Sequence, residues 1–121
     1  MQYNGQTLAY LGDAVYELMI RQHLLEKGVT KPAILHQEAV KWTSAKGQFE
    51  GFKKIEDQLS QDELDVIKRG RNTTLSRKAR NTDLITYHYA TGLEALFGYL
   101  HLHNQTKRIG QLIEKMTKKT I

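Results

Sequence analysis

The sequence predicts an all-α protein of about six to seven helices. Apolar residues recur at three- and four-residue steps along most of the chain, and no segment shows the sustained alternation of apolar and polar residues that is typical of a β-strand. The only proline is Pro32, which leaves room for long helices between boundaries of glycine and asparagine. Because the 121 residues contain no internal repeat or low-complexity linker, one domain over residues 1–121 is expected.

The first four helices have recognisable ends. The first is expected from about Gln6 to Lys27, followed by Gly28 at the position where glycine commonly ends a helix. The second opens at Pro32, a favoured first helical position, and runs to about Trp42. Ser44 can cap the third, which continues to Ile55. Ser60 and Glu63 form a capping box that opens the fourth.

The apolar period stops between Lys68 and Asn81, so this stretch is predicted to be a loop or a frayed helix end. A strongly apolar fifth helix follows from Asp83 to about His103, capped by Asn81 or Thr82. A short amphipathic helix then closes the chain. Its apolar residues are Ile109, Leu112, Ile113 and Met116.

Composition excludes several classes of protein. No apolar run approaches the length of about 20 residues that a membrane span needs, and the first residues do not resemble a secretory signal. Cysteine is absent, which excludes disulfides, thiol catalysis and thiolate metal sites, and the cytoplasm is the default compartment. The net charge of +5 favours a polyanionic partner.

Two carboxylates interrupt apolar helical segments. Asp13 lies within Leu-Gly-Asp-Ala-Val of the first predicted helix, and Glu94 lies within Gly-Leu-Glu-Ala-Leu-Phe-Gly of the fifth. A carboxylate among core residues is unfavourable unless it is paired or bound to a metal, and hard oxygen ligands suit Mg²⁺. The alternative is a surface ladder of salt bridges, because Glu17 and Arg21 follow Asp13 at successive steps of four residues.

These segments resemble the ribonuclease III family. The residues from Leu8 to Val15, LAYLGDAV, are similar to the family's signature LEFLGDAVL, and those from Leu93 to Leu100, LEALFGYL, are similar to its second acidic motif, EALIGAIYL. The compact bacterial branch, the Mini-ribonucleases III, is more similar still. It shares the KRGRN segment that begins at Lys68, and Asn-Thr-Asp from Asn81.

The resemblance implies an all-helical, dimeric, Mg²⁺-dependent endoribonuclease that cleaves double-stranded RNA and leaves 5′-phosphate and 3′-hydroxyl ends. Asp13 and Glu94 fall on the two catalytic, metal-binding acidic positions. The compact branch is implicated in maturation of 23S ribosomal RNA precursor and has no separate double-stranded-RNA-binding domain, for which this chain has no room. The resemblance also suggests a ribosomal protein as an assisting partner, but the sequence does not indicate which one.

The chain departs from full-length members of the family at two positions. Those enzymes carry a glutamate where Ala9 stands and an aspartate where Thr91 stands. The loss of two carboxylates leaves the number of metal ions open, and Glu17 or water could complete the coordination.

A basic segment without acidic residues is the candidate RNA-binding site. A charge run is often only a solvated face, but next to a site that cuts duplexes, contact with phosphates is the better interpretation. The candidate residues are Lys68, Arg69, Arg71, Asn72, Arg77, Lys78 and Arg80. Two other functions stay open: a helical dimer that binds structured RNA without cutting it, and an interaction protein with no RNA role.

Overall fold

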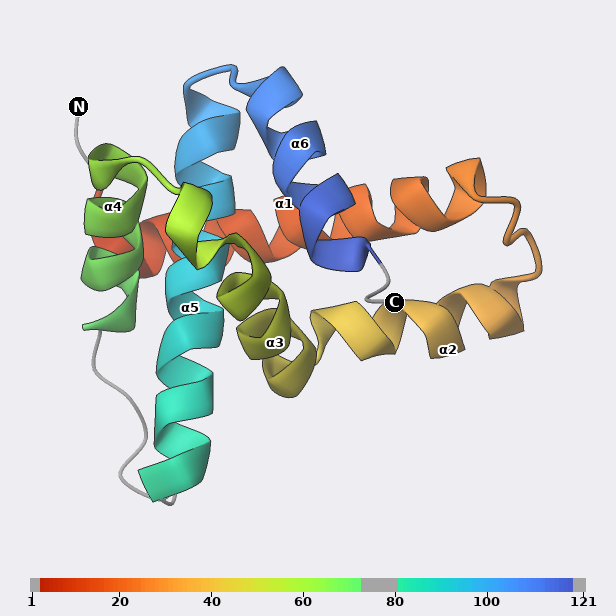
Figure 1. The fold of residues 1–121 in the computed structure, drawn as a ribbon, viewed down its shortest axis with the longest axis horizontal. Coiled ribbons are helices and arrows are strands. Elements are labelled where there is room, and N and C mark those ends of the chain that lie inside the picture. Colours follow the sequence, from red (N-terminus) through yellow and green to blue (C-terminus); the bar gives the residue numbers. More distant parts are fainter. Residues whose placement is uncertain (1–2, 73–80, 119–121) are drawn as a thin grey trace.

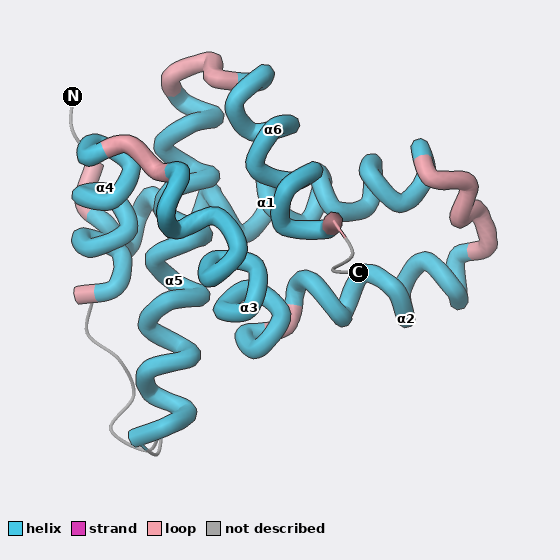
Figure 2. Tube along the Cα trace, in the orientation of Figure 1, coloured by secondary structure: helices cyan, strands magenta, loops and turns pink. Residues whose placement is uncertain are grey.

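The computed structural model describes residues 3–72 and 81–118, and within them it contains helices and no strand (Figure 2). The all-α prediction is confirmed. The elements are α1 (Gly5–Glu26), α2 (Pro32–Thr43), α3 (Ala45–Ile55), the 3₁₀ turn η1 (Glu56–Gln58), α4 (Gln61–Arg71), α5 (Asn81–Leu102) and α6 (Thr106–Thr117).

The helices pack around a crossing of α1 and α5. Figure 1 shows α5 running across α1, with α3 and α4 beside α5 and α6 folding back at its C-terminal end. α2 returns alongside α1, so that the two form an arm to one side. In the described part of the chain, no helix combines the length and the apolar content that a bilayer crossing requires.

Local hydrogen bonds set the helix ends close to the predicted positions. The Ser60 side chain accepts from the Glu63 amide at 3.1 Å, and the Glu63 carboxylate accepts from the Ser60 amide at 2.8 Å. This is the predicted capping box. Ser44 Oγ accepts from the Gly47 amide at 3.0 Å and caps α3. Gly28 has a φ of 93°, a left-handed conformation that suits glycine after the end of α1.

Of the two alternatives predicted from Lys68, a loop or a frayed helix end, the loop is wrong for the first turn, because α4 continues to Arg71 and Asn72 is its C-cap. Gly70 looks like a helix breaker in the sequence, but it lies against Gly92 and Ala95 of α5. A side chain there would collide with α5, so this glycine permits close packing of two helices. Residues 73–80, the remainder of the predicted loop, lie outside the described residues.

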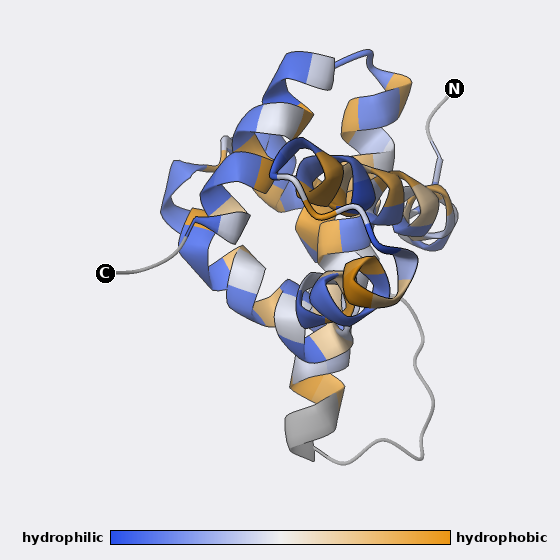
Figure 3. Cartoon of the chain, turned by 90° about the vertical axis from the view of Figure 1, so that its right-hand side faces the viewer, coloured by the Kyte–Doolittle hydropathy of each residue, from blue (hydrophilic) through white to orange (hydrophobic). Residues whose placement is uncertain are grey.

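The core lies where the helices meet, and hydrophobic stretches are concentrated there (Figure 3). α5 contributes Leu93, Leu96 and Phe97, which are fully buried. The Tyr16 ring of α1 packs on Phe97 with centroids 5.1 Å apart, and the Tyr16 hydroxyl donates to the Trp42 carbonyl at 2.7 Å. α1, α2 and α5 are therefore joined through one buried side chain.

Two glycines allow α1 and α5 to come into backbone contact. A methyl group on Gly12 would overlap the carbonyl oxygen of Glu94, and one on Gly98 would overlap the carbonyl oxygen of Leu8. The two helices can therefore reach this separation only with hydrogen in place of a side chain at both positions. Since Asp13 follows Gly12, the same contact sets the position of its backbone relative to Glu94.

Replacement of Gly12 or Gly98 by alanine should force the helices apart and destabilise the protein by at least ~1–3 kcal/mol, the usual range for overpacking. Gly110→Ala is the matched control, because Gly110 lies within α6 with open space around its Cα. That change should instead stabilise the fold by ~0.5–1 kcal/mol through helix propensity. Urea unfolding of the three variants measures these shifts. Equal effects of Gly12→Ala and Gly110→Ala would contradict the close crossing.

Candidate functional site

Asp13 and Glu94, the two predicted site residues, are brought together at the crossing of α1 and α5. The carboxyl group of Asp13 acts directly on that of Glu94, both by its charge and as a hydrogen-bonding partner. Because the two acids come from distant parts of the chain, only the packing of these helices makes them neighbours. The structure thus assembles a pair of carboxylates.

The environment of Glu94 opposes its negative charge. Burial raises the pKa of Glu94 most, the Gln48 amide lowers it, and the neighbouring Asp13 raises it again, to a final value of about 7. Gln48 Nε2 donates to Glu94 Oε2 at 3.2 Å. An acid in this state is stabilised by any cation that binds between it and Asp13.

Asp13 itself is exposed, and the expectation that it would lie within an apolar face is wrong. It lies on the surface side of α1, where water solvates it, so that burial is confined to Glu94. The alternative salt-bridge ladder forms only in part. Arg21 pairs with Glu17 at 3.6 Å, but among the described residues no lysine or arginine pairs with Asp13.

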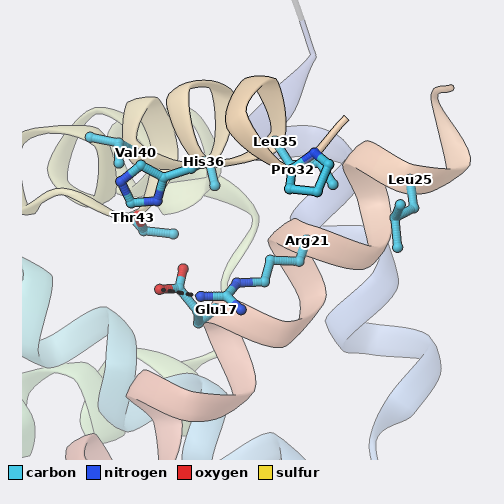
Figure 4. Close-up of a pocket in the computed structure, with 9 residues that line it drawn as sticks. Glu17, Arg21, Leu25, Pro32, Leu35, His36, Val40 and Thr43 are labelled. Atoms are coloured by element: carbon cyan, nitrogen blue, oxygen red, sulfur yellow. Dashed lines mark ion pairs between the residues drawn. The ribbon is translucent and has the colours of Figure 1, made fainter. Parts of the chain in front are cut away.

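Glu17 lies at a separate cavity between α1 and α2 (Figure 4). The cavity has a volume of about 330 Å³, and its lining includes Arg21 and His36. The second oxygen of Glu17, Oε2, is buried without a hydrogen-bond partner in the described part of the chain. Within residues 3–72 and 81–118, no three acidic or histidine side chains are grouped closely enough to hold a metal ion, so Glu17 does not join Asp13 and Glu94 in such a group.

The two positions that lack the family's carboxylates have other roles in this chain. Ala9 is buried against Leu8, Val66 and Ala95, where a charged side chain would be unfavourable. Thr91 donates its hydroxyl to the Tyr87 carbonyl within α5 at 3.0 Å. Asp13 and Glu94 therefore form a pair of carboxylates that positions 9 and 91 do not extend.

Sequence reasoning missed two polar residues beside the pair. Gln48 is only 3% exposed, and Tyr16 lies close enough to Glu94 for the two to affect each other. The pKa of the Tyr16 hydroxyl is raised, first by burial and then by Glu94 and Glu17, so it remains a neutral donor to Trp42. No periodic or motif signal marks either residue, because each is defined by a contact between helices.

The predicted RNA-binding residues divide into three groups. Lys68 and Asn72 are exposed. Arg69 donates to the Tyr3 carbonyl, while Arg71 donates to the Tyr89 hydroxyl at 3.1 Å and lies over its ring at 5.4 Å. These two arginines are half-buried and serve the fold. The third group lies outside the described residues and comprises Arg77, Lys78 and Arg80.

Comparison with known proteins identifies the family. The ribonuclease III domain family matches residues 6–105. The chain is 48% identical to a Mini-ribonuclease 3 of Streptococcus pneumoniae, covering 91% of this chain and 88% of that one. It is 44% identical to the Mini-ribonuclease 3 of Enterococcus faecalis, with 98% and 91% covered. A crystal structure of a protein from Fusobacterium nucleatum matches with a TM-score of 0.81 at 32% identity, covering 93% of this chain and 90% of that one.

Ribonuclease III enzymes act on double-stranded RNA, generally use a divalent metal and typically form dimers. The helical fold and the acidic pair at the crossing of α1 and α5 agree with these properties. The match extends over most of the chain. This chain belongs to the ribonuclease III family, in the group of the Mini-ribonucleases 3, and is an endoribonuclease.

Proposed function

We propose that Asp13 and Glu94 form the catalytic, Mg²⁺-binding site at which this endoribonuclease cleaves double-stranded RNA. The observation that carries the proposal is the state of Glu94: a carboxyl group with a pKa of about 7, placed beside a second carboxylate and bonded by a neutral amide, with no cationic side chain of the described residues paired to it. A cation bound between the two carboxylates would stabilise their ionised forms. We further propose that helices α1 to α6 make up one catalytic domain.

The donor set fits Mg²⁺ rather than a softer metal. Asp13 and Glu94 offer only oxygen atoms, and the chain has no cysteine. Mg²⁺ keeps several water ligands and is commonly held by one or two carboxylates together with substrate phosphate oxygens. Two carboxylates are thus sufficient for an ion that also contacts RNA, and the losses at Ala9 and Thr91 do not prevent binding.

In this mechanism the residues of the chain would hold the ion and keep the two carboxylates in place. When bound, the ion supplies activation of water and neutralisation of charge on the phosphate. Glu94 is held by Gln48 on a helix whose backbone touches α1, so its carboxylate stays close to Asp13 while RNA binds. Exposure of Asp13 leaves one side of the pair open to a phosphodiester.

The basic end of α4 is the proposed contact for RNA phosphates. Gly70 packs against Thr91, Gly92 and Ala95, so that this turn lies beside the segment of α5 that carries Glu94. Lys68 is exposed there, and we propose that it contacts phosphates together with Arg77, Lys78 and Arg80, which lie outside the described residues. Asn72 adds a neutral donor. Contacts with phosphates and 2′-hydroxyls favour recognition of duplex shape over sequence.

We propose that the enzyme is a homodimer. One face of α1 carries large apolar side chains that the described residues leave uncovered: Tyr10 is 86% exposed, Leu18 59% and Leu25 51%. Residues at this helical spacing form a stripe that a second copy could cover. A two-fold axis would place two sites for the two strands of a duplex.

We also propose a setting for the activity. From the resemblance to the compact branch, and in line with the match to bacterial Mini-ribonucleases 3, we propose 23S ribosomal RNA precursor as substrate, a ribosomal protein as assisting partner and the cytoplasm as compartment. The alternative from the sequence, a dimer that binds structured RNA without cutting it, rests on Ala9 and Thr91 in place of carboxylates. The match to the Mini-ribonucleases 3 favours the endoribonuclease instead.

The charge of Glu94 should make metal-free stability depend on pH. Its folded pKa of about 7 exceeds the ordinary value of 4.5, so the stability associated with the protonated acid is complete below pH 4.5 and is lost as the pH rises through 7. The free energy of unfolding of Glu94→Gln should therefore be ~1–3 kcal/mol greater than that of wild type at pH 8, since each pKa unit corresponds to ~1.4 kcal/mol.

Urea unfolding in chelator at pH 4.5 and pH 8 measures this effect, and the gain should disappear at the lower pH. Glu50→Gln is the control, since Glu50 pairs with Lys53 on the surface of α3 and should change stability by less than ~0.5 kcal/mol. A Glu94→Gln protein no more stable than wild type at pH 8 would show that Glu94 carries no electrostatic strain.

The cleavage test uses a long RNA duplex with and without Mg²⁺. Wild type should cut only with metal, whereas Asp13→Asn and Glu94→Gln should each lose most of the cutting and still bind duplex RNA. Both changes keep the size of the side chain and remove its charge. A mobility shift without cutting by wild type would favour the binding function, and near-wild-type cutting by either variant would exclude the proposed site.

Lys68→Ala tests RNA binding separately from the metal-binding pair. It should weaken duplex binding to a similar extent for different sequences and reduce the slope of log K against log salt by up to ~1, because one phosphate contact is lost. Its Mg²⁺ requirement should stay at the wild-type value. Lys115→Ala, an exposed lysine of α6, is the matched control. Equal binding and salt slopes for both variants would make the end of α4 only a solvated face.

Light scattering tests the dimer at micromolar concentration. Wild type should have twice the monomer mass of 13.9 kDa, and Tyr10→Asp should shift the population towards monomer because it places a charge in the apolar stripe. Tyr87→Asp is a matched control on α5, where Tyr87 is also exposed. A monomeric wild type under conditions that support cleavage would overturn this proposal.

A further inference from the structure

Gln48 is a buried polar residue that the proposed chemistry does not use directly. Its side chain is 3% exposed, and its amide nitrogen donates to Glu94 Oε2 at 3.2 Å. We propose that Gln48 is a positioning residue, which orients the Glu94 carboxylate for a divalent cation without contributing charge. The inference rests on the proposed function of Asp13 and Glu94 as the metal-binding pair.

The first turn of α3 holds Gln48 at a fixed place. The backbone N–H of Gln48 donates to the Ser44 carbonyl at 2.9 Å, and Ser44 Oγ caps the helix by accepting from the backbone N–H of Gly47. Gly47 lies directly against the carbonyl of Lys41 at the end of α2, where a side chain would collide. That end of α2 is in turn bonded to Tyr16 of α1 through the Trp42 carbonyl. The donor is therefore anchored to α1, the helix that carries Asp13.

The neutrality of the amide matters for the site. A carboxylate has two oxygens, and Gln48 donates to Oε2; among the described residues no amide N–H donates to Oε1, so the carboxylate keeps lone pairs for a cation beside Asp13. A lysine or arginine at position 48 could make the same hydrogen bond, but its positive charge would compete with the metal ion. An amide orients the acid and preserves the negative charge of the pair.

The same chain shows the other way to hold a buried acid. Glu63 accepts from Arg108 at 2.8 Å through both of its oxygens, and this ion pair lowers its pKa. Glu63 is thereby neutralised and joins α4 to α6 as a structural element. Glu94 has an amide in place of an arginine, as expected for a carboxylate whose charge partner comes from outside the protein.

Gln48→Met tests the proposal, because methionine keeps the unbranched shape and removes the donor. Mg²⁺ binding is measured by calorimetry on the protein without RNA, and the Mg²⁺ concentration for half-maximal cleavage is measured separately. The dissociation constant for Mg²⁺ and the Mg²⁺ concentration for half-maximal cleavage should both rise by about 10- to 100-fold, the usual effect of losing a partner that orients a metal ligand. Excess Mg²⁺ should restore most of the maximal rate, and duplex binding in chelator should equal that of wild type.

Gln61→Met is the matched control. Gln61 also donates its amide to a carboxylate, Asp65, at 2.8 Å, but on the exposed face of α4. This change should leave the Mg²⁺ affinity at the wild-type value. Gln48→Asn is a second variant for the case in which Gln48→Met melts below the assay temperature, because it keeps an amide but shortens its reach.

The outcomes separate the two proposals. Unchanged Mg²⁺ affinity in a folded Gln48 variant overturns the positioning role, and so does a loss of cleavage that excess Mg²⁺ fails to restore, which would mark Gln48 as a packing residue only. If wild type itself neither binds Mg²⁺ nor cuts duplex RNA, the proposed function fails, and the role of Gln48 falls with it.

Discussion

The contact between the backbones of α1 and α5 is the constraint on which the site depends. Gly12 and Gly98 lack side chains where the two helices cross, and each touches a carbonyl group of the opposite helix. Without this approach Asp13 and Glu94 would lie on separated helices, and Asp13 would not raise the pKa of Glu94. The remaining helices support the crossing: α4 packs on α5 through Gly70, and α3 is anchored beside it and contributes Gln48. A small chain can in this way build a site from two acids without a dedicated loop.

The ionised form of Glu94 lowers the stability of the fold that brings it beside Asp13. Burial and a neighbouring carboxylate both favour the neutral form of Glu94, so its ionised form is strained at neutral pH. The Glu63–Arg108 pair shows that the chain can neutralise a buried acid within its own structure. At the crossing of α1 and α5 no basic side chain among the described residues pairs with Asp13 or Glu94. Strain of this kind is expected where a charged ligand is held ready for a partner that binds later.

Local features could be predicted from the sequence, whereas contacts between helices could not. The Ser60 capping box, the start at Pro32 and the glycine after α1 were located because each depends on neighbouring residues. Gly70 was misread as a loop signal, since its role is visible only in its contact with α5. Asp13 was expected within an apolar face, but the side chains around it in sequence do not determine which side of α1 faces water. Its pairing with Glu94 is predicted from the two carboxylates in apolar segments and, more specifically, from the family resemblance, whereas Gln48 carries no signal in the sequence.

The end of α4 shows how fold and function share one basic segment. Arg69 and Arg71 could contact RNA in an extended loop, but in the helix they bond to Tyr3 and Tyr89 instead. Their charge still contributes to the electrostatic potential beside Glu94, because a charge attracts a phosphate over several ångströms without touching it. Lys68 is exposed and free to make direct contact. Under the proposed function, this basic turn, held by its own arginines, attracts a duplex towards the acidic pair. The proposed role of Gln48 is then to keep Glu94 oriented for a cation that offsets the repulsion between carboxylates and phosphate.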